Sequence, residues 1–142
     1  MIARLSSPDP QKATYDTFLN ALKVAGFQGE IARDHGDRTV LATDNSIYQR
    51  LPQAAVFPLD EQDVMILSRL AAEPAHRAVV LTPRGGGTGT NGQSLTDGVV
   101  VDLSRHLNNI LESNVEERWA RVQSGVVKDQ LNAALKPYGL FF

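Results

Sequence analysis

The sequence predicts an α+β fold in which a small parallel βαβ unit is joined to a hairpin and flanking helices. Three apolar runs rich in β-branched residues, at 54–59, 78–82 and 98–103, are typical of buried strands. Between the first two runs, apolar residues recur at helical spacing. Continuous apolar strands joined through a helix favour a parallel sheet that is covered on both faces.

The composition fits one ordered domain. The chain has 142 residues, of which 42% are apolar and 21% are charged. Its net charge of −2 argues against binding to nucleic acid or to an anionic membrane, since both need a basic surface. There is no continuous apolar stretch of membrane-spanning length, no signal-like start and no cysteine. We therefore expect a soluble, cytoplasmic protein without disulfides or thiolate metal sites.

The first third of the chain reads as one helix followed by an irregular segment. Asp9 and Pro10 suit a helix start, and Gly26 suits its end. The buried face of this helix is predicted to carry Tyr15, Phe18, Leu19 and Leu22. Residues 28–53 are polar and are expected to be irregular, with a turn at 34–37.

The remaining elements follow in order. Asp60 is expected to cap the helix of the βαβ unit, with Asp63 in its first turn. The buried stripe of that helix is predicted to be Val64, Leu67 and Ala71, with Leu70 beside it. Residues 110–125 alternate as in a hairpin, with a turn at 114–117. A last helix is predicted over 127–135, ended by Pro137 and Gly139.

One loop carries the chemistry. Five of the chain's 11 glycines fall between residues 85 and 92. Such a cluster lowers stability unless the backbone conformation is needed, and one need is the binding of phosphate by successive N–H groups. Residues 87–92 match the dinucleotide fingerprint G-x-G-x-x-G, and residues 87–94 match a P-loop except for Gln93 in place of lysine. Both motifs require a following helix, and only residues 95–97 precede the next strand, so we reject both and keep a backbone cradle for phosphate.

A strand, a glycine loop and another strand, with no helix between them, resemble the first FAD-binding segment of vanillyl-alcohol-oxidase type flavoproteins. The residues that carry this resemblance are 83–89 and 98–104, with 121–125 and the helix after them. Residues 43–48 and Phe57–Pro58 resemble, more narrowly, the branch that oxidises D-2-hydroxy acids such as D-lactate, glycolate or D-2-hydroxyglutarate. The resemblance spans roughly residues 43 to 139.

The resemblance implies the N-terminal part of a PCMH-type FAD-binding domain, over residues 54–142, after a lead-in at 1–53. It implies an FAD-dependent oxidoreductase that acts on a CH–OH group of a 2-hydroxy acid and passes its electrons on to a further acceptor. The cofactor-binding residues that it implies are Arg84, Gly85, Gly86, Gly87, Thr88, Gly89, Gly92, Gln93 and Ser94. Some relatives carry a histidine, bonded to the flavin, where this chain has Thr88, so the resemblance implies non-covalent FAD.

Other interpretations stay open. The same broad family includes enzymes for alcohols and sugars, and the loop also suits a nucleotide-binding or phosphate-binding module without flavin, or a scaffold whose glycines serve backbone geometry alone. Arg84 fits a pyrophosphate partner and a solvated arginine equally well. Asp102 is expected to cap residues 104–106 rather than act in catalysis. The sequence shows neither a catalytic base nor a metal-ligand set, so we expect the chain to be inactive alone. Because it stops at Phe141 and Phe142, two apolar residues with nothing to pack against, we expect a chain truncated after residue 142.

Overall fold

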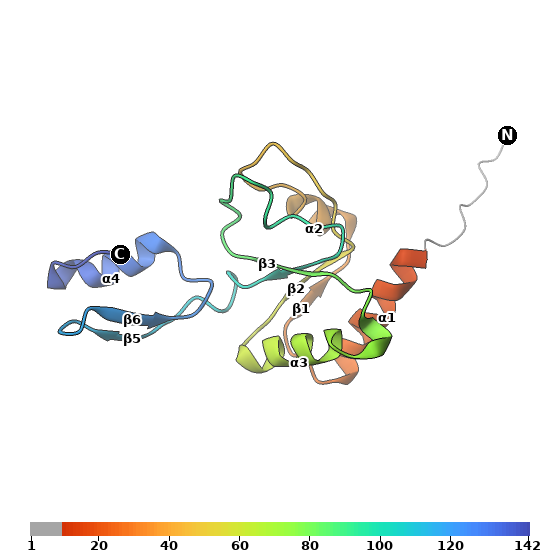
Figure 1. Ribbon diagram of the computed structural model, residues 1–142, viewed down its shortest axis with the longest axis horizontal. Coiled ribbons are helices and arrows are strands. Elements are labelled where there is room, and N and C mark those ends of the chain that lie inside the picture. The colour runs from red at the N-terminus through yellow and green to blue at the C-terminus, as the bar shows by residue number, and fades with distance from the viewer. Residues whose placement is uncertain (1–9) are drawn as a thin grey trace.

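The computed structural model of the chain describes residues 10–142, which form a four-stranded sheet with helices on both faces and a two-stranded hairpin unit (Figure 1). The predicted cap at Asp9 lies outside the described residues. The elements are α1 (Pro10–Val24), β1 (Glu30–Ala32), α2 (His35–Val40), β2 (Ala54–Phe57), α3 (Glu61–Ala71), η1 (Pro74–His76), β3 (Leu81–Arg84), β4 (Val99–Asp102), β5 (Ile110–Asn114), β6 (Trp119–Val122), α4 (Lys128–Leu135) and η2 (Lys136–Tyr138).

The main sheet has the strand order β1-β2-β4-β3. Strand β4 is parallel to both of its neighbours, with Val101 opposite Val56 of β2 and Pro83 of β3. Strand β1 is antiparallel to β2. Helix α3 connects β2 to β3, and β4 lies between these two strands. The predicted parallel βαβ unit, and with it the α+β fold class, is confirmed.

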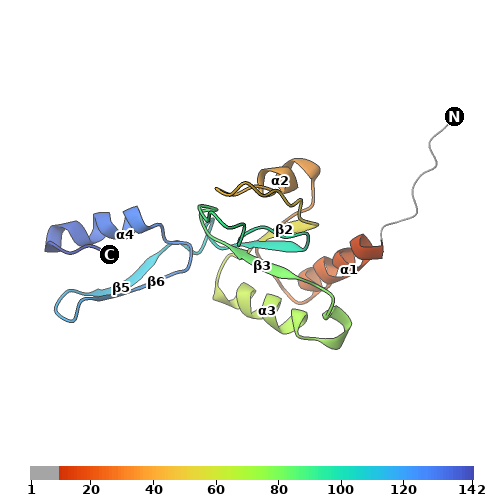
Figure 2. The same ribbon diagram turned by 45° about the horizontal axis from the view of Figure 1, so that its top comes forward.

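Apolar side chains cover both faces of this sheet. On one face, Phe18 and Leu22 of α1 and Leu67 of α3 pack with Val56 and Val99 (Figure 2). On the opposite face, where α2 lies, the smaller buried cluster is Leu41, Ala55, Phe57 and Val100. Because successive residues of a strand face opposite sides, the uninterrupted apolar run of β2 supplies both clusters.

The expectation of an irregular segment at 28–53 is wrong in two places. Residues 30–32 form β1, an edge strand whose Ile31 lies opposite Val56. Residues 34–37 are not an isolated turn, because Asp34 occupies the N-cap position of α2, which begins at His35. Both elements are short, and contact with β2 rather than local pattern stabilises them.

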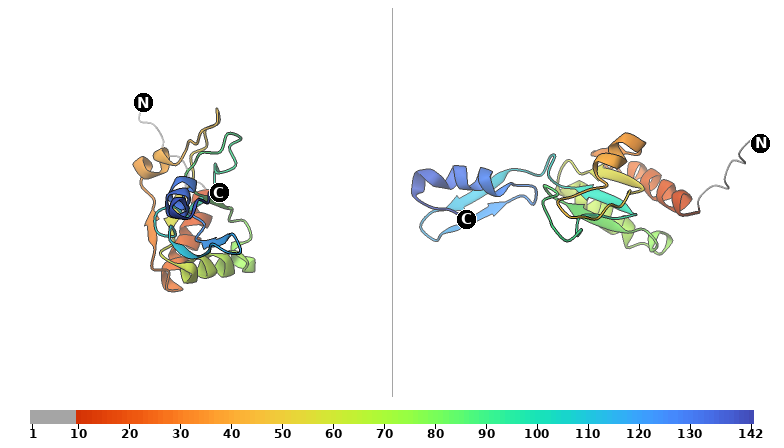
Figure 3. Two further views of the ribbon diagram at one scale, coloured as in Figure 1. Left: turned by 90° about the vertical axis from the view of Figure 1, so that its left-hand side faces the viewer. Right: turned by 90° about the horizontal axis from the view of Figure 1, so that it is seen from above.

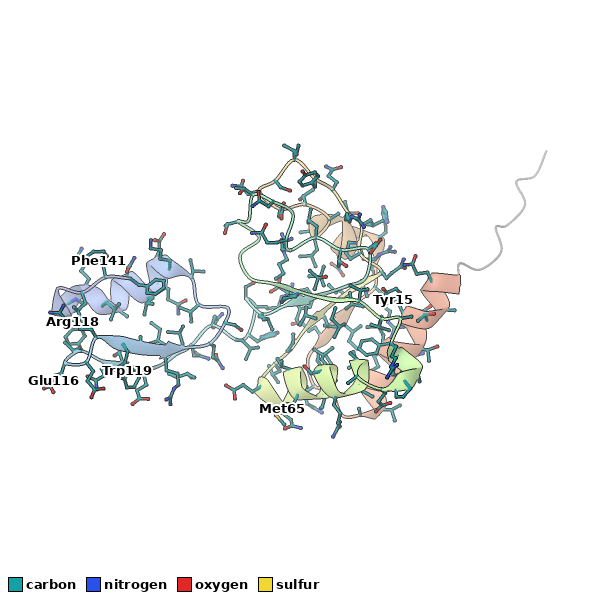
Figure 4. All side chains as sticks on the ribbon, in the orientation of Figure 1. Tyr15, Met65, Glu116, Arg118, Trp119 and Phe141 are labelled. Atoms are coloured by element: carbon teal, nitrogen blue, oxygen red, sulfur yellow. The ribbon has the colours of Figure 1, made fainter. Side chains whose placement is uncertain are left out.

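Strand β3 lies further along the chain than predicted, at 81–84 instead of 78–82. It is an edge strand of intermediate exposure rather than a buried one, which accommodates Pro83 because an edge strand can lack a ladder donor. Val80, just before it, donates its N–H to the hydroxyl of Tyr15, which reaches across from α1 (Figure 4). In α3 the buried apolar residues are Ile66, Leu67 and Leu70, whereas the predicted Val64 and Ala71 are only partly buried.

The hairpin β5–β6 and helix α4 form as predicted, and they lie beside the sheet rather than on it (Figure 3). Residues 103–109 connect the two parts, and the N–H of Gly125 donates to the carbonyl of Leu107 at 2.8 Å. Gly139 ends the final turn in the left-handed conformation, with φ of 67°. Within the described part of the chain, no helix combines the length and the apolar character that a membrane crossing requires.

Candidate functional site

The glycine loop, residues 84–94, begins at the carboxyl end of β3. Because β3 and β4 are parallel neighbours, the chain must return to the opposite end of the sheet before β4 starts. The return path rises on the α2 side of the sheet, alongside residues 43–50 (Figure 1). No helix lies between the two strands, as the sequence predicts.

The first half of the loop presents free backbone donors. In the described part of the chain, none of the backbone N–H groups from Gly86 to Thr90 donates a hydrogen bond. A series of unpaired N–H groups beside glycines can converge on the oxygens of an anion. Gly85, Gly86 and Thr88 are exposed, so an anion could reach this backbone from solvent.

The glycines of the loop are needed for different reasons. A Cβ on Gly87 would meet the guanidinium of Arg84, and Gly87 also has φ of +65°. A Cβ on Gly89 would meet the side chain of Gln93. By contrast, a Cβ on Gly85 would meet nothing within 4 Å, and one on Gly86 would come no nearer than 3.7 Å to the methyl group of Thr88. Internal packing therefore explains Gly87 and Gly89 but gives no reason for Gly85 and Gly86.

Arg84 lies beneath the loop. Its Nη2 donates to the carbonyl of Thr43 at 2.9 Å, and the guanidinium lies against Gly87. Its Nη1 is buried and has no hydrogen-bond partner among the described residues. An unpaired buried donor is costly, and an acceptor from a bound anion would relieve that cost. The structure thus excludes the interpretation of Arg84 as a freely solvated loop residue.

The second half of the loop turns back toward β4. The carbonyl of Gly92, which has φ of +72°, accepts the N–H of Leu95 at 3.0 Å, and Gln93 Oε1 accepts the N–H of Asn91 at 3.1 Å. Ser94 is buried, and its hydroxyl donates to Asp44 Oδ2 at 3.1 Å. Of the nine residues predicted from the resemblance, the stretch from Arg84 to Gly89 surrounds the open backbone, whereas Gly92, Gln93 and Ser94 shape the return.

Asp44 is a residue of this site that the sequence interpretation left without a role. Its Oδ1 accepts the N–H of Ser46 at 2.9 Å. Hydrogen bonding by Ser46, first through its hydroxyl and then through its backbone, lowers the pKa of Asp44 despite partial desolvation, and Ser94 and the charge of Arg84 lower it further. Asp44 is therefore ionised at neutral pH. The only signal in the sequence was the family resemblance of residues 43–48, because contacts across 50 residues are invisible to local patterns.

Two cavities lie in different parts of the molecule. One of about 250 Å³ lies between the return half of the glycine loop and residues 48–50. It is lined by Tyr48, Gln49, Arg50, Asn91, Gly92 and Leu95. A larger one, of about 780 Å³, lies between the hairpin and α4, where Trp119 and Phe141 contribute to its lining (Figure 4). The larger cavity is mostly apolar and lies away from the glycine loop, so we place the functional site at the loop.

Polar side chains outside the glycine loop have structural partners. Asp102, at the end of β4, accepts the N–H and the hydroxyl of Ser104 at 2.9 and 2.7 Å, which confirms its predicted capping role. His76 is buried against the ring of Phe18. His106 contacts Glu30 at 2.9 Å. Within residues 10–142, no group of three or more potential ligands is arranged to hold a metal ion.

Comparison with known proteins gives consistent results. Residues 52–142 match the family model described as FAD binding domain. A D-2-hydroxyglutarate dehydrogenase of Pseudomonas putida is 71% identical over 142 residues, all of this chain and 14% of that protein. A D-2-hydroxyglutarate dehydrogenase of Pantoea ananatis is 61% identical over 126 residues, 89% of this chain and 12% of that protein. The chain thus spans about one seventh of the length of these relatives.

Among solved structures, an alkyldihydroxyacetonephosphate synthase superposes with a TM-score of 0.73. The match covers 98% of this chain and 30% of that protein, at 24% sequence identity. The likeness shows that the sheet, the hairpin unit and their arrangement recur in another protein of known structure.

Proposed function

The chain belongs to the FAD-binding domain family, and on that premise we propose that its glycine loop holds the pyrophosphate of FAD in an oxidoreductase that oxidises a 2-hydroxy acid. The observation that carries the proposal is the open backbone at Gly85 and Gly86, which internal packing does not explain. The buried, unpartnered Nη1 of Arg84 supports it independently. The residues present therefore fit a diphosphate, and FAD is the family's cofactor.

We assign the phosphate contacts to the loop predicted from the resemblance. Unpaired N–H groups from Gly86 to Thr90 would donate to the phosphate oxygens, with Arg84 supplying positive charge from below. Gly92 and Gln93 would fix the return of the loop, and Ser94 would anchor it. Because Thr88 cannot form the bond that a histidine forms with flavin, and the chain has no cysteine, we propose non-covalent FAD. The division of the chain after residue 53 stays a prediction.

The two relatives named above favour D-2-hydroxyglutarate as the first substrate to test, with D-lactate and glycolate next. When bound, the flavin supplies the acceptor for a hydride from the carbon that bears the hydroxyl group. The protein must also provide a base for the hydroxyl proton and cations for the carboxylate. We propose that these groups, and the site for the electron acceptor, lie outside these 142 residues. We also propose that the complete enzyme is cytoplasmic. Enzymes for an alcohol or a sugar remain the nearest alternative.

The visible absorption spectrum of the purified complete polypeptide tests this function. We expect a flavin band that moves into the supernatant when the protein is denatured and precipitated. A band that stays with the precipitate would contradict non-covalent binding. A protein that remains colourless after incubation with FAD, and that binds ATP or NAD more tightly, would favour the nucleotide-binding module instead.

A further inference from the structure

Residues 43–48, hereafter the 43–48 loop, lie directly against the glycine loop. Arg84 Nη2 donates to the carbonyl of Thr43 at 2.9 Å, and the N–H of Asn45 donates to the carbonyl of Gly87 at 3.1 Å. The hydroxyl of Ser94 donates to Asp44 at 3.1 Å. The two loops are therefore joined at the start, the middle and the end of the glycine loop.

Asp44 is the side chain that organises these contacts. One carboxylate oxygen accepts the N–H of Ser46 and thereby shapes the 43–48 loop itself. The other accepts the hydroxyl of Ser94 and thereby holds the far end of the glycine loop. Arg84, which is hydrogen-bonded to the residue before Asp44, contributes the positive charge that favours the carboxylate. A single ionised group thus bridges two segments that are 50 residues apart.

The glycine loop depends on such external contacts. From Gly86 to Thr90 its backbone N–H groups make no hydrogen bonds in the described chain, so this first half of the loop does not stabilise its own conformation through its N–H groups. Glycine also has more conformational freedom to lose than any other residue. A ligand that must order this loop binds less tightly by the free energy of ordering, whereas a loop held in advance avoids that cost.

We propose that Asp44 is a positioning residue for the cofactor: it holds the glycine loop in the conformation that binds the pyrophosphate of FAD, acting through Ser94 and through the 43–48 loop without touching the cofactor. This inference rests on the proposed function. It extends the binding site to a segment that precedes the residues matched by the family model, which begin at residue 52.

The test compares Asp44→Asn with wild type in the complete polypeptide, from which FAD has been removed. Asparagine keeps the shape of the side chain but removes its charge and one acceptor. We expect the Kd for FAD, measured by quenching of flavin fluorescence, to rise about tenfold, as the loss of a charged hydrogen bond predicts. We expect faster hydrogen exchange in residues 85–93 of the apoprotein, an unchanged thermal midpoint and an unchanged flavin spectrum at saturation.

The matched control is Asp97→Asn. Asp97 pairs with Arg50 at 3.0 Å, so it joins the residues that directly follow the two loops, but both of these side chains are about 60% exposed and the pair should contribute little. The control should bind FAD as wild type does. Conversely, Asp44→Glu, which retains the charge, should recover part of the lost affinity.

Several results would overturn the inference. Wild-type affinity for FAD in Asp44→Asn would remove the specific role of Asp44, and so would an equal loss of affinity in Asp97→Asn. A lower thermal midpoint without faster exchange in the loop would reduce Asp44 to a fold-stabilising residue. If the wild-type protein binds no FAD, the proposed function and this inference are both overturned. If the wild-type protein binds FAD and Asp44→Asn binds it equally well, the inference alone is overturned.

Discussion

At the scale of single residues, glycines of the same loop differ in what requires them. Gly87 and Gly89 leave room for the side chains of Arg84 and Gln93, so their absence of a Cβ is explained within the chain. A Cβ on Gly86 would make only an ordinary contact, at 3.7 Å, with the methyl group of Thr88, so contacts within the chain do not require a glycine there. The proposed approach of a phosphate to this backbone would require it. The sequence could predict that the cluster binds phosphate, but only the structure separates the two roles.

Asp63 is the residue whose importance the sequence understated. The sequence indicated a first-turn acidic residue that interacts with the helix dipole. The structure shows a carboxylate that is only 1% exposed and accepts the N–H groups of Gln28 and Leu59 at 2.8 and 2.9 Å. It therefore joins the segment after α1 to the start of α3. No local pattern could reveal a partner 35 residues away.

We predict that Asp63→Ala lowers the free energy of unfolding by about 3 kcal/mol, because two shielded N–H groups lose their acceptor. Urea denaturation followed by circular dichroism measures the change. Asp129→Ala is the matched control, since Asp129 is an exposed first-turn residue of α4, and we expect a change within about 0.5 kcal/mol. Equal losses in the two variants would contradict the structural role of Asp63.

At the scale of elements, strands within continuous apolar runs were predictable, whereas two short elements without such a run, β1 and α2, were not. The runs that became β2 and β4 carry enough apolar residues to identify themselves. Strand β1 has three residues and α2 has six, and each exists because it contacts β2. The shift of β3 has a similar origin, since pairing with β4, not local composition, selects residues 81–84.

The edge strand β1 is held by a charged cluster. Glu30 pairs with Arg105 at 2.6 Å and with His106 at 2.9 Å, and the Arg105 guanidinium lies 3.6 Å from the centre of the Phe57 ring. The pKa of Glu30 lies below its ordinary value of 4.5. The main cause is the hydrogen bond with His106, and the charge of Arg105 lowers the pKa further. The cluster fastens β1 to the turn after β4.

This shift predicts a pH dependence of stability. Because the folded pKa is lowered, the contribution of Glu30 is fully present above pH 4.5 and is lost as the pH falls through the folded value. We expect Glu30→Gln to lower the thermal midpoint at pH 7, and the difference from wild type to shrink as the pH falls below 4.5. Thermal unfolding between pH 3 and pH 7 (about one point per half unit) is the measurement. A difference that is constant across this range would contradict the assignment.

At the scale of the whole molecule, the hairpin unit lies beside the main sheet and is joined to it through residues 103–109 (Figure 3). Gly125 is buried at this junction, where a Cβ would meet the carbonyl oxygen of Leu103 and come within 2.7 Å of the Cα of Ser104. The sequence predicted the hairpin and α4 correctly. Their position relative to the sheet was not predictable, because it depends on this backbone contact.

We predict that Gly125→Ala loosens the junction without unfolding the sheet. Hydrogen exchange should accelerate in residues 103–135 and stay unchanged in β2 and β4, because the added methyl group displaces backbone only at the junction. Mass spectrometry of the exchanged peptides distinguishes the two regions. Faster exchange throughout the sheet would show instead that the two parts unfold as one unit.

The affinity of Gly86→Ala for FAD shows whether the open backbone of the glycine loop holds the FAD pyrophosphate. The substitution meets no internal obstacle, so the apoprotein should unfold at the wild-type temperature. We expect the Kd for FAD to rise at least about tenfold, since a methyl group blocks close approach of phosphate, while Gly36→Ala, in exposed α2, leaves it unchanged. If Gly86→Ala binds FAD with wild-type affinity, the open backbone of the glycine loop does not hold the pyrophosphate.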